Sequence, residues 1–144
     1  MSLTIRPFSS DDFTRWQELW DQNNLGQSKP DVTRETWRRL LDKDESVYGL
    51  GAYLEDGPLI AIMHYILHPV TGSLAPACYM QDLFTDPAYR GQGTARALLH
   101  ALEKEYKEEK WARIYWIADM NNAAAQKLYQ SFGARMNFSF HVLI

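Results

Sequence analysis

A short glycine-bearing segment carries the clearest chemical signature of this 144-residue chain. It consists of Arg90, Gly91, Gln92, Gly93, Thr94 and Ala95. Glycine has no Cβ, so the backbone N–H groups of Gly91 and Gly93 can approach an anion closely. A helix is expected to begin here, and its first N–H groups lack intrahelical partners and carry a partial positive charge. Together with the Arg90 guanidinium, these donors suit a pyrophosphate.

Two other nucleotide-binding patterns do not fit this segment. The Lys-Ser/Thr ending of a P-loop is missing, which disfavours ATP or GTP hydrolysis. The spacing also differs from the Gly-x-Gly-x-x-Gly of dinucleotide-binding folds. The hexapeptide alone leaves one alternative, a glycine-rich turn that binds no ligand.

Histidines and cysteine offer little further chemistry. His64 and His68 share one face of an expected strand, and histidine suits general-base work near neutral pH, but an ordinary half-buried position is favoured for both. The four histidines are scattered, and the single cysteine, Cys78, has no metal-ligand spacing. No metal is therefore expected.

Acidic residues gather near the N-terminus. Two expected helices and their flanks carry Asp11, Asp12, Asp21, Asp31 and Glu35. A cationic partner bound beside these helices is one hypothesis, and a solvated helix face is the other.

Hydrophobic periodicity predicts the elements that position these residues. Strands are expected at residues 3–8, 47–54, 59–67, 76–85, 113–118 and 138–144. Helices are expected to begin near residues 13, 94 and 122, with a short helix around 37–41. In the strand 76–85, strict alternation places Met80 and Asp82 on one face and Gln81 and Leu83 on the other. The strand–helix–strand unit around 94–110 predicts a right-handed parallel crossover in an otherwise antiparallel sheet.

Bulk properties limit the function classes. With 46% hydrophobic and 13% aromatic residues, the chain is expected to form one domain, residues 1–144. A net charge of -3 argues against phosphate-mediated nucleic-acid binding. No apolar run is long enough for a membrane span, and no signal peptide is evident. With a single cysteine, these features predict a cytoplasmic protein.

The run from Asp82 to Ala95 resembles the acetyl-CoA signature of the GNAT superfamily of N-acetyltransferases. The family loop reads Gln/Arg-x-x-Gly-x-Gly/Ala, and Arg90, Gly93 and Ala95 occupy the specified positions. The stretch from Asn122 to Gly133 is similar to the family's Asn-x-x-Ala-x-x-Leu-Tyr-x-x-x-Gly helix. The resemblance covers about 80–134 by residues and the rest by element order. It is nearest to the polyamine and histone acetyltransferase-like branch.

This resemblance implies an α/β (α+β) fold with a mixed, mostly antiparallel sheet of about seven strands, flanked by four helices. A splayed parallel central strand pair would leave room for acetyl-CoA, the implied co-substrate. The residues that the resemblance assigns to acetyl-CoA are Leu83, Phe84, Thr85, Arg90, Gly91, Gln92, Gly93, Thr94, Ala95, Asn122 and Tyr129.

The resemblance also implies catalytic roles. Tyr129 stands where the family places the acid that protonates the leaving thiolate, although an aromatic core residue fits the same position. Relatives often carry Glu-Asp where this chain has Gln81 and Asp82, and glutamine cannot accept a proton. Asp82 is expected to hold the substrate ammonium or relay its proton through water, with a paired structural aspartate as the alternative. A backbone N–H near Leu83 or Phe84 is implied as the oxyanion donor.

The implied reaction is acetyl transfer from acetyl-CoA to a primary amine on a small molecule, with a polyamine or another cationic small amine as the expected acceptor. Peptide, amino-acid and amino-antibiotic acceptors stay open. A non-catalytic coenzyme A sensor is favoured by the missing glutamate at position 81 and opposed by Tyr129. The resemblance also implies a homodimer, for which the apolar strand 138–144 offers an edge.

Overall fold

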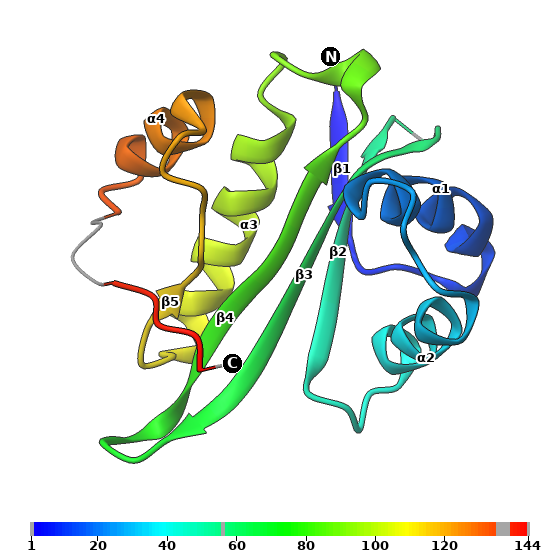
Figure 1. The fold of residues 1–144 in the computed structure, drawn as a ribbon. Coiled ribbons are helices and arrows are strands. Elements are labelled where there is room, and N and C mark those ends of the chain that lie inside the picture. Colours follow the sequence, from blue (N-terminus) through cyan, green and yellow to red (C-terminus); the bar gives the residue numbers. More distant parts are fainter. Residues whose placement is uncertain (1, 56, 135–138, 144) are drawn as a thin grey trace.

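A five-stranded sheet, in the order β1-β2-β3-β4-β5, runs through the computed structural model. The structure describes residues 2–55, 57–134 and 139–143. In chain order the elements are β1 (Leu3–Arg6), a 3-10 turn (Ser10–Asp12), α1 (Phe13–Asn23), α2 (Pro30–Leu41), β2 (Val47–Leu54), β3 (Leu59–Val70), β4 (Ser73–Thr85), a second 3-10 turn (Pro87–Tyr89), α3 (Thr94–Glu109), β5 (Ile114–Tyr115) and α4 (Ala123–Ser131). Figure 1 shows α1 and α2 on one face of the sheet and α3 and α4 on the other. None of the described helices is long and apolar enough to cross a membrane.

Each face of the sheet has its own hydrophobic core. On one face, Leu98, Leu99 and Leu102 form the apolar stripe of α3 and pack against β2, β3 and β4. This cluster is called the α3 core. On the other face, Trp16 and Leu19 of α1 are fully buried against β2 and β3. The sheet is thus covered on both sides, and β4 contributes Cys78, Met80 and Leu83 to the first core and Phe84 to the second.

An extra residue in β4 changes which core its side chains join. His64 of β3 pairs with Asp82, whereas the next residue, Tyr65, pairs with Met80, so Gln81 has no partner in the ladder. Such a bulge reverses the alternation of faces. Met80 lies in the α3 core, and Asp82 contacts α1. The prediction that Met80 and Asp82 share a face is therefore wrong.

The parallel pair is shorter than expected and lies at one end of the sheet. β5 pairs with β4 only at Cys78↔Ile114 and Tyr79↔Tyr115. Within the described residues, the rest of β4 has no strand partner on that side. The expected count of about seven strands is wrong, since five are found in the described residues. In the expected last strand, residues 139–143 form none, and residues 138 and 144 lie outside the described residues. The four expected helices are present.

Arg15 of α1 ties this helix to the end of β4. Its guanidinium donates to the Asp86 carboxylate and to the Leu59 carbonyl. Asp86 also caps the 3-10 turn after β4, because its carboxylate accepts the Ala88 N–H. The Ala88 N–H and the Arg15 guanidinium together lower the pKa of Asp86. The start of the glycine-bearing loop is therefore fixed to α1.

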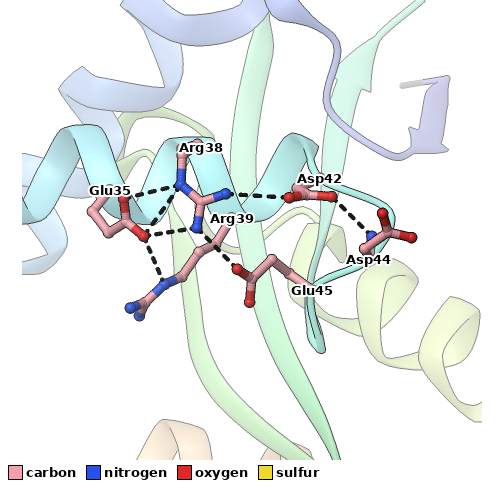
Figure 2. A network of polar contacts seen from close by, with 6 residues as sticks. All are labelled: Glu35, Arg38, Arg39, Asp42, Asp44 and Glu45. Carbon is pink, nitrogen blue, oxygen red and sulfur yellow. Dashed lines mark hydrogen bonds and ion pairs between the residues drawn. The ribbon is translucent and has the colours of Figure 1, made fainter.

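A charged network on the exposed side of α2 holds the chain that leads into β2. Figure 2 shows Arg38 between Glu35, Asp42 and Glu45, with Arg39 also donating to Glu35. Such exposed pairs contribute little singly, and their effect is greatest as a network. Here the network joins the last turns of α2 to residues 42–45.

We expect Asp86→Asn to lower the free energy of unfolding by about 1 kcal/mol at pH 7, because the ion pair with Arg15 is lost while the cap acceptor is kept. The lowered pKa of Asp86 means that its stabilisation is present above the ordinary carboxyl pKa and is lost as pH falls through the folded value. The difference between wild type and variant should therefore shrink on acidification. Urea unfolding at pH 7 and below pH 4 measures this, with Asp44→Asn as the control. A difference that stays constant with pH would contradict the assignment.

Candidate active site

The loop that precedes α3 presents unpaired backbone donors. Gly91 and Gly93 have φ angles of 76° and 83°, in the left-handed region that favours glycine. The first bond of α3 is donated by Ala97 to the Gly93 carbonyl. Within the described residues, the amides from Gly91 to Arg96 have no acceptor, and the space in which a Cβ would stand at either glycine is open. These features fit an anion such as a diphosphate.

Arg90 links this loop to the end of β4. Its Nε–H donates to the Thr85 carbonyl at 3.0 Å, and its guanidinium carbon lies 5.2 Å from the centre of the Phe84 ring. The structure thus brings Phe84, Thr85 and Arg90 together. Leu83 instead packs against the α3 core. Thr94 is buried, and its hydroxyl has no partner among the described residues.

Asp82 lies on the α1 face, and its carboxylate contacts the side chains of Asn23 and His64. Its Oδ1 accepts from the Asn23 amide at 3.2 Å, and its Oδ2 lies 3.0 Å from Nδ1 of His64. Its side chain is 18% exposed. Within the described residues it has no lysine or arginine partner. The carboxylate is therefore fixed in place while its charge is left without a permanent counter-ion.

The sequence alone does not connect Trp16 with the site, and for His64 it favours an ordinary half-buried position over general-base work. The Trp16 indole donates to Nε2 of His64 at 3.0 Å, and the other ring nitrogen meets Asp82. His68, expected on the same strand face, instead contacts the Tyr115 hydroxyl at 2.7 Å. The pairing of His64 with Asp82 follows from the bulge at Gln81, which strict alternation could not indicate.

Asn122, the N-cap of α4, and Tyr129, within α4, differ in how their side chains are engaged. The Asn122 Oδ1 accepts the Ala125 N–H at 3.1 Å, so this side chain caps its own helix. Tyr129 packs against Trp116, with ring centroids 4.9 Å apart, and joins the edge of the α3 core. Burial raises the pKa of the Tyr129 hydroxyl above its ordinary value. Tyr129 is therefore protonated at neutral pH, and it lies on the opposite face of the sheet from Asp82.

Comparison with known proteins agrees with this arrangement. A model of the acetyltransferase (GNAT) family matches residues 11–134. The chain belongs to this family. It is an acetyl-CoA-dependent N-acetyltransferase with a mixed α/β GNAT fold.

Two curated relatives and one solved structure illustrate the likeness of this GNAT protein. It is 27% identical over 131 residues to the D-amino-acid N-acetyltransferase HPA3 of Saccharomyces cerevisiae, covering 88% of this chain and 81% of that protein. It is 29% identical over 142 residues to the spermine/spermidine N(1)-acetyltransferase of Bacillus subtilis, covering 95% and 90%. The structure of AAC(6')-Iy with the bisubstrate analogue CoA-S-monomethyl-acetylneamine superposes with a TM-score of 0.85 at 19% identity, covering 100% and 98%.

Most of the acidic residues expected to line the acceptor site of this GNAT protein have structural partners. Asp12 and Glu35 form ion pairs with arginines, and Asp31 accepts a local backbone N–H. Asp21 differs, because it lines a shallow hollow between the end of α1 and Phe84. Among the described residues, no group of three or more His, Cys, Asp or Glu side chains is placed to hold a metal.

We expect Gly93→Glu to weaken acetyl-CoA binding by about 100-fold or more, because a carboxylate would stand among the loop amides. Gly133→Glu is the control, since its φ of 79° imposes the same backbone strain and its Cβ also meets open space. Isothermal titration calorimetry measures both affinities. Equal affinity in the two variants would remove the loop from the binding site.

Proposed function

We propose that residues 1–144 form a single domain that transfers the acetyl group to a primary amine of a small cationic molecule such as a polyamine. The observation that carries this proposal is the state of Asp82, a partly exposed carboxylate that contacts the Asn23 amide and the His64 imidazole and has no lysine or arginine partner within the described residues. A carboxylate without a counter-ion in a partly desolvated place attracts an ammonium group. Asp21, at the hollow beside the same end of α1, adds a second negative charge.

The loop and the end of β4 would hold acetyl-CoA. The amides from Gly91 to Ala95 and the Arg90 guanidinium suit its diphosphate. Leu83, Phe84 and Thr85 belong to the part of β4 that β5 leaves unpaired. The Asn122 side-chain oxygen caps α4, and within the described residues its amide N–H groups have no hydrogen-bond acceptor. When bound, acetyl-CoA supplies an activated acetyl thioester.

Asp82 and Tyr129 would move the two protons of the reaction. An alkylammonium has a pKa of about 10.4 and must lose a proton before it can attack. Asp82 would hold the ammonium and accept that proton directly or through water. The Tyr129 hydroxyl, kept protonated by burial, donates a proton to the leaving thiolate. Because the two groups lie on opposite faces of the sheet, the acetyl group would pass between them at the unpaired edge of β4. A backbone N–H of β4 near Leu83 or Phe84 would stabilise the oxyanion.

The names of the relatives support an amine acceptor without choosing one. They mention D-amino acids, spermine and spermidine, and an acetylated neamine analogue, all of which are amines. The uncompensated charge of Asp82 favours an acceptor with more than one positive charge over a free amino acid, whose own carboxylate would be repelled. We further propose a homodimer, supported by the exposed apolar side chains of Phe140, Val142 and Leu143.

We expect spermidine to give a higher kcat/KM than free amino acids, lysine peptides or aminoglycosides when release of free thiol is followed. Asp82→Asn should lower kcat/KM for spermidine by about 100-fold, because the ammonium loses its counter-charge and its proton acceptor. Asp44→Asn, an exposed change outside the acidic set near the N-terminus, is the control. Binding of acetyl-CoA without turnover of any amine would contradict the proposal and indicate a coenzyme A sensor.

We expect Tyr129→Phe to lower kcat by about 100-fold while the affinity for acetyl-CoA changes little, since the hydroxyl acts as the thiolate departs. Tyr48→Phe, which removes a hydroxyl on β2, is the control. Steady-state kinetics and calorimetric affinity separate the two effects. Full turnover in Tyr129→Phe would remove this residue from the mechanism.

A further inference from the structure

A buried chain of hydrogen bonds leads to the Asp82 carboxylate and fixes its orientation. The chain runs from the Trp16 indole to Nε2 of His64, at 3.0 Å, and from Nδ1 of His64 to Oδ2 of Asp82, also at 3.0 Å. Asn23, at the end of α1, donates to the other carboxylate oxygen at 3.2 Å. Both carboxylate oxygens are thus engaged, while part of the carboxylate stays exposed.

The donor and acceptor types in this chain select one tautomer of His64. An indole nitrogen can only donate, so the Nε2 atom that faces Trp16 must be an acceptor and carries no proton. In a neutral imidazole the proton then lies on Nδ1, which donates to Asp82. The other neutral tautomer would set two N–H donors against each other at Nε2 and leave Nδ1 facing a carboxylate with no proton between them.

The surroundings of His64 exclude a direct role for it in proton exchange with substrate. His64 is 2% exposed, and Trp16 is 0% exposed. The rings of Phe8, Trp16 and Trp20 surround it at centroid distances of 6.0, 5.9 and 5.6 Å. Among the described residues, Asp82 is the charged group in contact with it. His64 can therefore reach the acceptor amine only through Asp82.

We propose that His64 is a positioning residue, which Trp16 locks as the Nδ1–H tautomer so that it fixes the Asp82 carboxylate that receives the acceptor ammonium. This inference rests on the role of Asp82 in the proposed function. The order is the reverse of a serine hydrolase triad, in which a carboxylate stands behind an imidazole that does the chemistry. Here the imidazole stands behind the carboxylate. Because the donor is neutral, it orients the carboxylate without cancelling the charge that attracts the amine.

The tautomer is measured directly on the wild-type protein. A long-range ¹H–¹⁵N correlation spectrum at pH 7 reports the protonation of each ring nitrogen of the four histidines, with His64 assigned by its absence in His64→Asn. We expect His64 to show a protonated Nδ1 and an unprotonated Nε2. The Nε2–H tautomer, or a doubly protonated ring, would overturn the proposal.

Two tryptophan variants test the lock itself. Trp16→Phe removes the indole N–H and is expected to let Nε2 of His64 carry a proton in part of the molecules. Trp20→Phe is the matched control, because the Trp20 indole donates to Thr33 at 3.1 Å and not to His64. A single Nδ1–H tautomer in Trp16→Phe would refute the role of Trp16.

Kinetics of two His64 variants separate positioning from packing. His64→Leu removes the donor and should lower kcat/KM for the amine by about tenfold, as expected for one lost hydrogen bond to a charged group, with KM for acetyl-CoA unchanged. In His64→Asn the side-chain amide can stand where Nδ1–H stands, so most of the lost activity should return. Equal losses in both variants, or a loss confined to KM for acetyl-CoA, would overturn the positioning role.

The outcomes also distinguish this inference from the proposed function. Full activity in Asp82→Asn would refute the role of Asp82 in the reaction, whatever the tautomer of His64. Conversely, a low activity in Asp82→Asn together with the Nε2–H tautomer of His64 would leave the role of Asp82 in place and refute the lock.

Discussion

The bulge at Gln81 determines what each face of the sheet can do. Before the bulge, Cys78 and Met80 point into the α3 core, and in an unbroken strand Asp82 would join them. A carboxylate in that apolar cluster would be costly to bury. The extra residue turns Asp82 to the other face, where Asn23 and His64 supply the hydrogen bonds that it needs. The bulge also lies just beyond the last residue of β4 that pairs with β5. The carboxylate and the unpaired strand edge are therefore close together in sequence.

Much of the fold could be predicted from periodicity, and the failures have physical reasons. β2 and the start of α3 agree with the pattern because amphipathic elements repeat regularly. The bulge at Gln81 could not be found, since an inserted residue leaves no mark on composition and only shifts the phase of the alternation. The short β5 was overestimated because residues 116–118 keep a strand-like alternation without a ladder partner within the described residues. The glycine loop was identified readily, since its donors are backbone groups that follow from local sequence, whereas the contacts of Asp82 depend on register and on a helix about 60 residues away.

One helix positions both halves of the site. Adjacent residues of α1 make separate long-range bonds, Arg15 to Asp86 at the end of β4 and Trp16 to His64 behind Asp82. Two turns later Asn23 binds Asp82 itself. The helix is therefore bound both to Asp86, which precedes the loop that suits a diphosphate, and to the carboxylate that suits an amine. A displacement of α1 would move both attachments at once, so the distance between the two ends of the site is set by a rigid element rather than by loops.

Asp82 differs from the other carboxylates of this region in the side chains that bind it. Asp12, Glu35 and Asp86 are bound by arginines, which neutralise their charge and give them structural roles. Asp82 is bound by an amide and an imidazole, which are dipoles. Dipolar donors stabilise a carboxylate and fix its orientation, but they do not cancel its net charge. An arginine in the place of His64 would hold the group as firmly and would remove the reason for an ammonium to bind there. The neutral, singly protonated state of His64 is thus what keeps Asp82 both ordered and negative, and the Trp16 indole favours that state by occupying the nitrogen at which a second proton would enter.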